Sequence, residues 1–172
     1  MNGVFIALGA NLGNPPETFA RALERIEADI GEVIARSSLW HSPAWPAGEG
    51  APNYTNAVIQ VLPRASADNT LAALHAIEAD FGRTRTLRNA PRTLDLDLIA
   101  FNQLMSDDSL KLPHPRLQDR PFVLLPLMEI APAFRHPLTG QGIFDMLARL
   151  PSPDVLAHRR LAPMLAFPAD SH

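Results

Sequence analysis

Arginine is concentrated in one short segment of this chain, and two aspartates follow the segment directly. Residues 83–92 contain four arginines and no acid, and Asp95 and Asp97 come next, within an apolar run. Planar guanidinium groups match the oxygens of a phosphate and bind them through paired hydrogen bonds. An arginine-rich segment that ends where an acidic strand begins is therefore suited to holding a polyphosphate.

Residues 95–101 are expected to form a β-strand, in which successive side chains point to opposite faces of the sheet. Asp95 and Asp97 then share one face. The other face takes the leucines that alternate with them, Leu94, Leu96 and Leu98. Two carboxylates held side by side repel each other unless a cation lies between them. Oxygen ligands of this kind suit Mg²⁺, which takes one or two carboxylates and completes its shell with water and substrate phosphates.

Each half of this pattern also has a plainer interpretation. A D-x-D pair alone is most often two solvated charges on an edge strand, and an arginine-rich segment alone is most often a solvated loop or an ion-pairing surface. The arginine-rich segment ends just before the aspartate strand begins. This adjacency favours a metal-dependent phosphate site, because it keeps the arginines and the carboxylates close together.

Composition is that of an ordinary globular domain. The chain has 172 residues, 47% of them hydrophobic and 19% charged, with a net charge of −3 and a sequence pI of about 6.0. We expect one domain over 1–172, with a core at about 1–150 and a peripheral tail at 151–172. The negative balance provides no field that attracts nucleic acid. There is no cysteine, no basic leader segment at the start and no apolar run of ~18 residues, so we expect a cytoplasmic location.

Hydrophobic periodicity predicts an α+β fold. The expected elements are a strand at 4–8, a helix from Asn14 to Gly31, strands at 33–40 and 54–62, a helix from about 66 to 82 and a strand at 95–101. This order, β-α-β-β-α-β, is that of a ferredoxin-like sheet. A hairpin at 103–112, a loop or short helix at 114–120 and helices at 122–129 and 143–150 are expected to pack around it.

Two further positions could bind a ligand. His114 lies between two prolines, which hold its backbone rigidly, and could donate to a phosphate or a leaving group. Asn56 shares a strand face with Tyr54 and could pair with the edge of an amide-like heterocycle. A solvated loop histidine and an asparagine with a turn or ladder role are the plainer alternatives, and the local residues leave both open.

Six segments of the chain, in order, resemble the motifs of the 6-hydroxymethyl-7,8-dihydropterin pyrophosphokinases of folate biosynthesis. They are residues 7–13 (ALGANLG), 54–57 (YTNA), Glu78 with 82–85 (GRTR), 91–97 (PRTLDLD), 113–116 (PHPR) and 120–132 (RPFVLLPLMEIAP). The PRTLDLD string is highly specific, and the resemblance extends from about residue 4 to about residue 150.

The resemblance implies transfer of a pyrophosphoryl group from ATP to the hydroxymethyl oxygen of the pterin, with release of AMP and with two Mg²⁺ ions held by Asp95 and Asp97. The catalytic residues it implies are Arg83, Arg92, Asp95 and Asp97. The ATP-binding residues are Glu78, Arg83, Arg85, Arg92, Leu98, His114 and Arg120. The pterin-binding residues are Ser42, Pro43, Trp45, Tyr54, Asn56, Asp95 and Phe122. The 42–52 loop would close over the substrates. The expected partners are these small molecules, without nucleic acid or membrane, and a monomer is expected.

Two positions depart from the family pattern. Asn89-Ala90 stands where the family often has Trp-Gly, and His75 stands where a glutamine can lie near ATP. These changes concern loop closure and affinity rather than the metal and phosphate groups. Two other functions compete: another two-metal nucleotide enzyme on a ferredoxin-like sheet, which would release pyrophosphate, and an RNA-binding module, which would need aromatic residues on the sheet and a basic surface.

Overall fold

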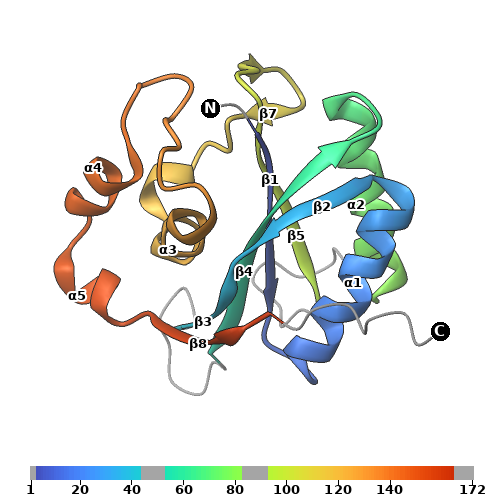
Figure 1. Cartoon of the computed structure of the whole chain (residues 1–172), viewed down its shortest axis with the longest axis horizontal. Coiled ribbons are helices and arrows are strands. Elements are labelled where there is room, and N and C mark those ends of the chain that lie inside the picture. The colour runs from blue at the N-terminus through green and yellow to red at the C-terminus, as the bar shows by residue number, and fades with distance from the viewer. Residues whose placement is uncertain (1–2, 44–52, 83–92, 165–172) are drawn as a thin grey trace.

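An antiparallel sheet forms the centre of the computed structural model, which describes residues 3–43, 53–82 and 93–164 (Figure 1). The strands are β1 (Val4–Ala10), β2 (Gly31–Arg36), β3 (Ser38–Ser42), β4 (Tyr54–Pro63), β5 (Asp95–Phe101), β6 (Ser106–Asp107), β7 (Lys111–Leu112) and β8 (Arg159–Pro163). The helices are α1 (Pro15–Asp29), α2 (Ala67–Asp80), α3 (Pro121–Ile130), α4 (Ile143–Ala148) and α5 (Ser152–Leu156), with a 3₁₀ turn η1 (Leu117–Asp119). The strand order is β5-β1-β4-β3-β8, and β2 pairs with the far half of β4. The predicted α+β fold is confirmed, and the predicted β-α-β-β-α-β order holds except that two strands, β2 and β3, replace the second one.

Local sequence sets both ends of α1. The Asn14 side chain accepts a hydrogen bond from the Glu17 amide (3.4 Å), and two prolines occupy the first turn, where an amide donor is not needed. At the other end Gly31 opens β2. A Cβ atom placed on Gly31 would lie 1.9 Å from the carbonyl oxygen of Leu62, so only glycine allows the chain to leave the helix this close to β4.

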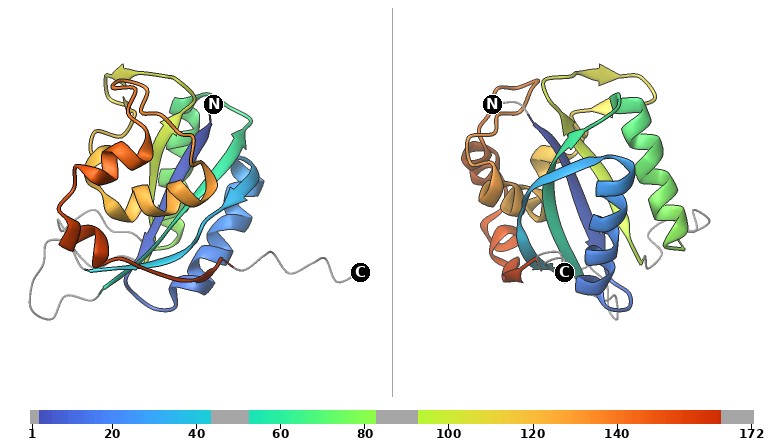
Figure 2. Two further views of the ribbon diagram at one scale, coloured as in Figure 1. Left: turned by 60° about the vertical axis from the view of Figure 1, so that its left-hand side comes forward. Right: turned by 45° about the vertical axis from the view of Figure 1, so that its right-hand side comes forward.

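Helices cover the two faces of the sheet separately (Figure 2). α1 and α2 lie on one face, over a buried apolar cluster that includes Ile6, Ile59 and Leu96. α3 and α4 lie on the other face, over a second cluster that includes Phe5 and Val58. Each of β1, β4 and β5 therefore contributes alternate residues to two cores, as the period of a strand requires.

The strand predicted at 33–40 is in fact two strands that meet at Ser37. Ser37 is buried and takes part in the ladder with both its main chain and its side chain. Its main-chain amide donates to the Val58 carbonyl (2.9 Å), and the Val58 amide donates to the Ser37 hydroxyl oxygen (2.9 Å). The hydroxyl in turn donates to the Ser38 carbonyl (2.7 Å). A side-chain oxygen thus replaces a main-chain oxygen, and the pairing register shifts between β2 and β3.

The C-terminal third confirms the hairpin, as β6 and β7, and the two helices, as α3 and α4. The segment predicted to be a peripheral tail contains one further strand. Residues 159–163 form β8, which pairs antiparallel with β3 and extends the sheet, although its side chains are exposed. The sequence did not indicate it because five exposed residues carry no hydrophobic alternation.

Candidate functional site

One row of the sheet brings together three predicted site residues from strands far apart in sequence. Gly9 of β1 lies between Asn56 of β4 and Asp95 of β5, and is paired with both. In the next row Ala7 of β1 is paired with Asp97. Asp95 and Asp97 are half-buried and share the α3 face of the sheet. The leucines between them are buried in the opposite core, so the predicted alternation is confirmed.

Gly9 leaves a strip of sheet without a side chain between an amide and a carboxylate. A Cβ atom there would lie 3.1 Å from Asn56 Oδ1 and 3.9 Å from Asp95 Cβ. The first distance is tighter than ordinary side-chain contacts, so any larger residue would fill this strip. Gly9 is buried, and its missing side chain leaves this piece of backbone flat.

Asn56 itself is held in place. Its Nδ2 donates to the hydroxyl of Ser42, which belongs to the neighbouring strand β3, and both residues are buried. Tyr54 is paired with Ser42 and is half-buried on the same face as Asn56. Pro43 is exposed at the end of β3. Four of the predicted pterin residues, Ser42, Tyr54, Asn56 and Asp95, thus lie on neighbouring strands of one face.

Arg120 connects the acidic strand with the start of α3. Its guanidinium Nη1 lies 3.6 Å from Asp97 Oδ2, and its Cζ lies 5.5 Å from the centre of the Phe122 ring. Both contacts are partly exposed, so the ion pair contributes less than about 1 kcal/mol to stability. Its geometric effect is larger, because one cation is held between the carboxylates and an aromatic ring.

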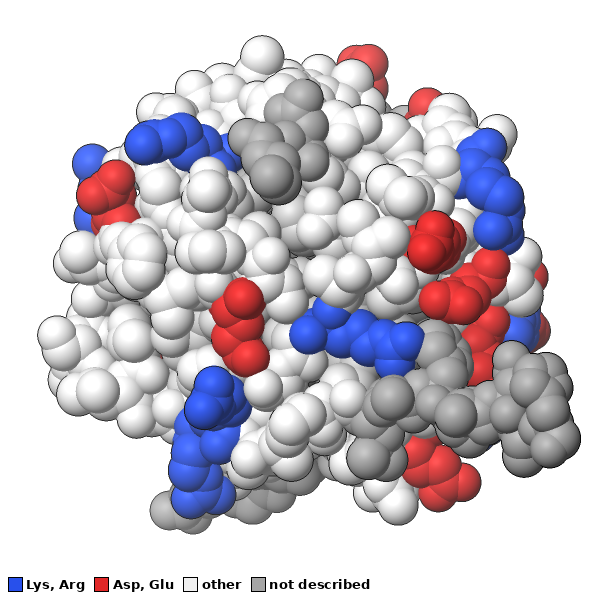
Figure 3. All heavy atoms as spheres, in the orientation of Figure 1, with Lys and Arg blue, Asp and Glu red and all other residues white. Residues whose placement is uncertain are grey.

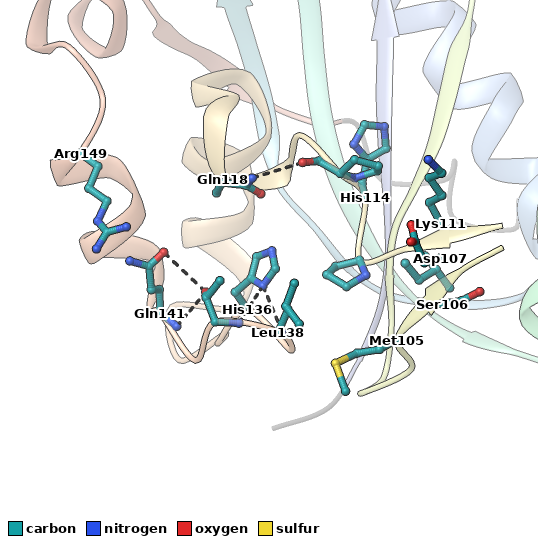
Figure 4. Close-up of a pocket in the computed structure, with 14 residues that line it drawn as sticks. Met105, Ser106, Asp107, Lys111, His114, Gln118, His136, Leu138, Gln141 and Arg149 are labelled. Atoms are coloured by element: carbon teal, nitrogen blue, oxygen red, sulfur yellow. Dashed lines mark hydrogen bonds between the residues drawn. The ribbon is translucent and has the colours of Figure 1, made fainter. Parts of the chain in front are cut away.

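His114 is a neutral hydrogen-bond donor beside these groups. Its amide donates to the Ile99 carbonyl of β5 (2.8 Å), and its Nδ1 accepts from the Arg116 amide (3.1 Å), which leaves the proton on Nε2. Burial lowers the pKa of His114 to about 4, assisted by the positive charges of Arg120 and Arg116 and opposed by Asp95. The following turn is held by Gln118, whose amide nitrogen donates to the Pro115 carbonyl (3.2 Å; Figure 4).

Two predicted ATP-binding residues have structural roles that the sequence did not reveal. Glu78 of α2 is buried, and its Oε2 accepts from the Leu96 amide (3.1 Å), which attaches the helix to the acidic strand. The side chain of Leu98 is buried in the core under α1 and α2. Contact of Leu98 with ATP would have to use its main chain. For both residues ATP binding stays a prediction.

Several predicted site residues lie outside the described part of the chain. They are Arg83, Arg85 and Arg92, with Trp45, most of the 42–52 loop and the Asn89-Ala90 departure. His75, the other departure, lies on the exposed side of α2. Among the described residues, no group of three or more His, Asp, Glu or Cys side chains could hold a metal ion. A metal at Asp95 and Asp97 would therefore need substrate oxygens and water to complete its shell, as Mg²⁺ often does.

A cavity of about 760 Å³ lies between the β6–β7 hairpin, the 113–118 loop and the 136–141 loop (Figure 4). Lys111, His136 and Arg149 line it, and of the predicted site residues that the structure describes only His114 does so. Gly9 and Asp95 are not among the described residues that line this cavity.

A face that combines carboxylates, an arginine and a neutral histidine is suited to an enzyme that acts on a phosphate ester. Comparison with known proteins identifies the enzyme family. The model of the 7,8-dihydro-6-hydroxymethylpterin-pyrophosphokinase (HPPK) family matches residues 5–132, and the chain belongs to this family.

Curated relatives and solved structures agree. A 2-amino-4-hydroxy-6-hydroxymethyldihydropteridine pyrophosphokinase of Pseudomonas aeruginosa is 40% identical over 151 residues, which cover 86% of this chain and 91% of the relative. One from Synechocystis is 36% identical, over 87% of this chain and 76% of the relative. A Plasmodium falciparum HPPK-DHPS structure has the same fold, with a TM-score of 0.71 at 14% identity; the match covers 86% of this chain and 44% of the longer one.

Proposed function

We propose that this chain transfers pyrophosphate from ATP to the hydroxymethyl group of 6-hydroxymethyl-7,8-dihydropterin, releasing AMP, in the biosynthesis of tetrahydrofolate. Family membership supports the reaction. The observation that carries the assignment of the site is the row of Asn56, Gly9 and Asp95, with Asp97 and Arg120 beside it. In this row a glycine lies between an amide side chain and a carboxylate, which supports a site for a planar heterocycle beside phosphate-binding groups.

The phosphate half of the site would be formed by β5 and the residues after it. Asp95 and Asp97 are the residues that would hold Mg²⁺, and their half-buried carboxylates on one face fit a hard cation. Two such ions, when bound, neutralise the charge of the triphosphate. Arg120 and the Nε2–H of His114 would donate to phosphate oxygens. We assign Arg83, Arg85 and Arg92 to the same task, with Arg83 and Arg92 stabilising the transition state. Glu78 and Leu98 would complete the ATP site.

The pterin half would be formed by β3, β4 and the start of α3. A planar ring lying on Gly9 can form hydrogen bonds with the Asn56 side chain, while Phe122 and Tyr54 supply aromatic faces for stacking. Ser42 fixes the orientation of Asn56. We assign Pro43 and Trp45, with the rest of the 42–52 loop, to closure over the bound substrates.

Product analysis tests the proposal directly. The protein is incubated with ATP, Mg²⁺ and the reduced pterin, and phosphorus NMR follows the products. Formation of AMP and a pterin diphosphate is expected, and neither should form without the pterin. Release of pyrophosphate instead would favour the alternative, a nucleotidyl-transferring enzyme that attacks the α-phosphorus.

An RNA-binding module is the weaker alternative. Charged side chains of both signs are interspersed on the face that Figure 3 shows, whereas RNA binding favours a continuous basic surface. Binding of labelled RNA at low salt with micromolar affinity would revive this alternative.

We also propose that the protein acts as a monomer in the cytoplasm. No helix in the described ranges is long and apolar enough to cross a membrane. The most exposed large apolar side chains, Leu138, Phe144 and Leu156, belong to three separate elements. Light scattering at working concentration gives the mass in solution, and a dimer mass would reject the monomer.

A further inference from the structure

Glu129, near the end of α3, is bonded to the strand that carries one wall of the proposed pterin site. Its Oε1 accepts from the Trp40 indole Nε1 (2.5 Å). Its Oε2 accepts from both the amide (3.2 Å) and the hydroxyl (2.8 Å) of Ser38. One carboxylate thus joins α3 to two residues on the same face of β3, although the partners are 89 to 91 positions apart in the sequence. Hydrogen bonds to an ionised acceptor are roughly twice as strong as neutral ones.

Glu129 and Phe122 lie on the same side of α3. They are seven residues apart, which is close to two helical turns, or about 10.5 Å along the axis. Pro126 lies between them and cannot donate an amide hydrogen bond to the Phe122 carbonyl. The helix is therefore weakened at the turn that carries Phe122, and its orientation depends on contacts with the sheet. Apolar packing supplies area but little direction, whereas hydrogen bonds fix a position.

On the strand side, the residues bonded to Glu129 belong to β3, which also positions Asn56 of the proposed pterin site. Trp40 is paired with Asn56, and Ser42, two residues further along β3, bonds to the Asn56 side chain. Glu129 therefore ties the helix that carries Phe122 to the strand that positions Asn56. These are the side chains assigned above to stacking on the pterin and to hydrogen bonding with it.

We infer that Glu129 is a positioning residue for the pterin, which sets the separation between Phe122 and Asn56 without contacting the substrates. The inference rests on the proposed pterin site. It applies mainly to the pterin, because the carboxylates of β5 and His114 do not depend on β3 and only Arg120 of the proposed phosphate ligands adjoins α3. Loss of Glu129 should therefore raise KM for the pterin much more than KM for ATP.

Three variants test the inference: Glu129→Ala, Glu129→Gln and, as a matched control, Glu24→Ala, which removes an exposed glutamate from α1. We expect Glu129→Ala to raise KM for the pterin about tenfold, the effect of ~1.4 kcal/mol, with KM for ATP and kcat within about twofold. Glu129→Gln keeps one acceptor oxygen and should be intermediate. Glu24→Ala should match the wild type. The indole ¹⁵N–¹H resonance of Trp40, assigned by Trp40→Phe, should move upfield when Glu129 is replaced by alanine.

Phe122→Ala separates failure of this inference from failure of the pterin site. If Phe122→Ala leaves pterin affinity unchanged, the site itself is misplaced. If Phe122→Ala weakens pterin binding but Glu129→Ala changes only the melting temperature, or raises both KM values equally, the positioning role is wrong. In the double variant the effect of Glu129→Ala should shrink, because the ring that it positions is gone. Full additivity would count against the inference.

Discussion

The two faces of the central sheet are built from the same three strands and differ at one end. Under α1 and α2, the inward side chains of β1, β4 and β5 are apolar along the whole length of the strands. Under α3 and α4 they are apolar around Phe5 and Val58, but polar where Asn56, Asp95 and Asp97 take their place. We call the face under α1 and α2 the closed face. The face under α3 and α4 is apolar near Phe5 and Val58 and polar near Asn56, Asp95 and Asp97, and we call this polar part its open end.

This difference shows how one strand serves two purposes. Successive residues of β5 face opposite sides, so Leu96 and Leu98 can hold the fold while Asp95 and Asp97 remain available for chemistry. Stability and activity should therefore respond to different residues of the same short strand. Substitutions on the closed face should lower stability, and those at the open end should lower activity or affinity.

The largest separation is expected between Asp97 and its neighbour Leu96. Asp95→Ala and Asp97→Ala should each reduce turnover by ~10³-fold or more, because charge on the triphosphate is no longer neutralised, while the melting temperature changes little. Leu96→Ala, on the buried face, should instead cost about 2–5 kcal/mol of unfolding free energy. Initial rates of AMP formation and thermal unfolding measure the two effects.

The double variant Asp95→Ala/Asp97→Ala gives the strongest test of this separation. It should fold, because both side chains are only half-buried and lie outside the apolar clusters of the sheet. A folded double variant that still converts ATP to AMP with Mg²⁺ would overturn the assignment of β5. Arg92→Ala, from the segment outside the described residues, should likewise lower turnover much more than melting temperature.

Phe122→Ala should affect one substrate and not the other. The half-buried ring lies at the edge of the apolar cluster under α3, next to Arg120. Its removal should weaken pterin binding by roughly 10- to 100-fold, since stacked aromatic contact and burial are both lost. Calorimetric titration with the pterin, and separately with a non-hydrolysable ATP analogue, measures this. Equal loss for both ligands would contradict the division of the site.

A smaller effect is expected at Gly9, where an alanine would add one methyl group between Asn56 and Asp95. Gly9→Ala should lower pterin affinity about tenfold with under about 1 kcal/mol of destabilisation, because the new Cβ would lie 3.1 Å from Asn56 Oδ1. Ala7→Gly, two residues earlier on the same face, is the matched control. It should cost about 1 kcal/mol of stability and leave pterin affinity unchanged. The opposite ranking in pterin affinity would move the ligand away from Gly9.

Local sequence patterns predicted which face of the sheet each strand residue occupies, because that depends on periodicity alone. Alternation in 54–62 and 95–101 placed Asn56 and the two aspartates on their faces, and Asn14 predicted the start of α1. The break at Ser37 was not predictable, because it depends on hydrogen bonds to Val58 of another strand.

The same limit explains the residues that the sequence missed. Nothing near Glu129 in the chain indicates Trp40 or Ser38, and nothing near Glu78 indicates the Leu96 amide. A side chain whose partners lie on another element carries no local signal. Residues proposed to contact a ligand directly were predicted from motifs, whereas those proposed to position them emerged only from the structure.

The smallest expected effect concerns the loop between α3 and α4, which lies over the part of the α3 face near Phe5. Phe134 packs edge-on against Phe5, with ring centres 5.6 Å apart, and two residues later the buried His136 organises a turn. His136 Nδ1 accepts from the amides of Leu138 (3.2 Å) and Thr139 (3.3 Å). Burial lowers the pKa of His136 below its ordinary value of 6.5.

Because the unfolded chain binds this proton more readily, stability should rise with pH up to about 6.5 and then level off. His136→Asn keeps an oxygen acceptor for the two amides but does not titrate. Between pH 7 and pH 5 the wild type should therefore lose up to about 1 kcal/mol more unfolding free energy than this variant. His114 and His158, whose pKa values are also lowered, contribute equally to both proteins and cancel in the difference. Urea unfolding at several pH values measures it. Parallel pH profiles for the two proteins would contradict this prediction, because they would show that the turn tolerates a charged imidazole at His136.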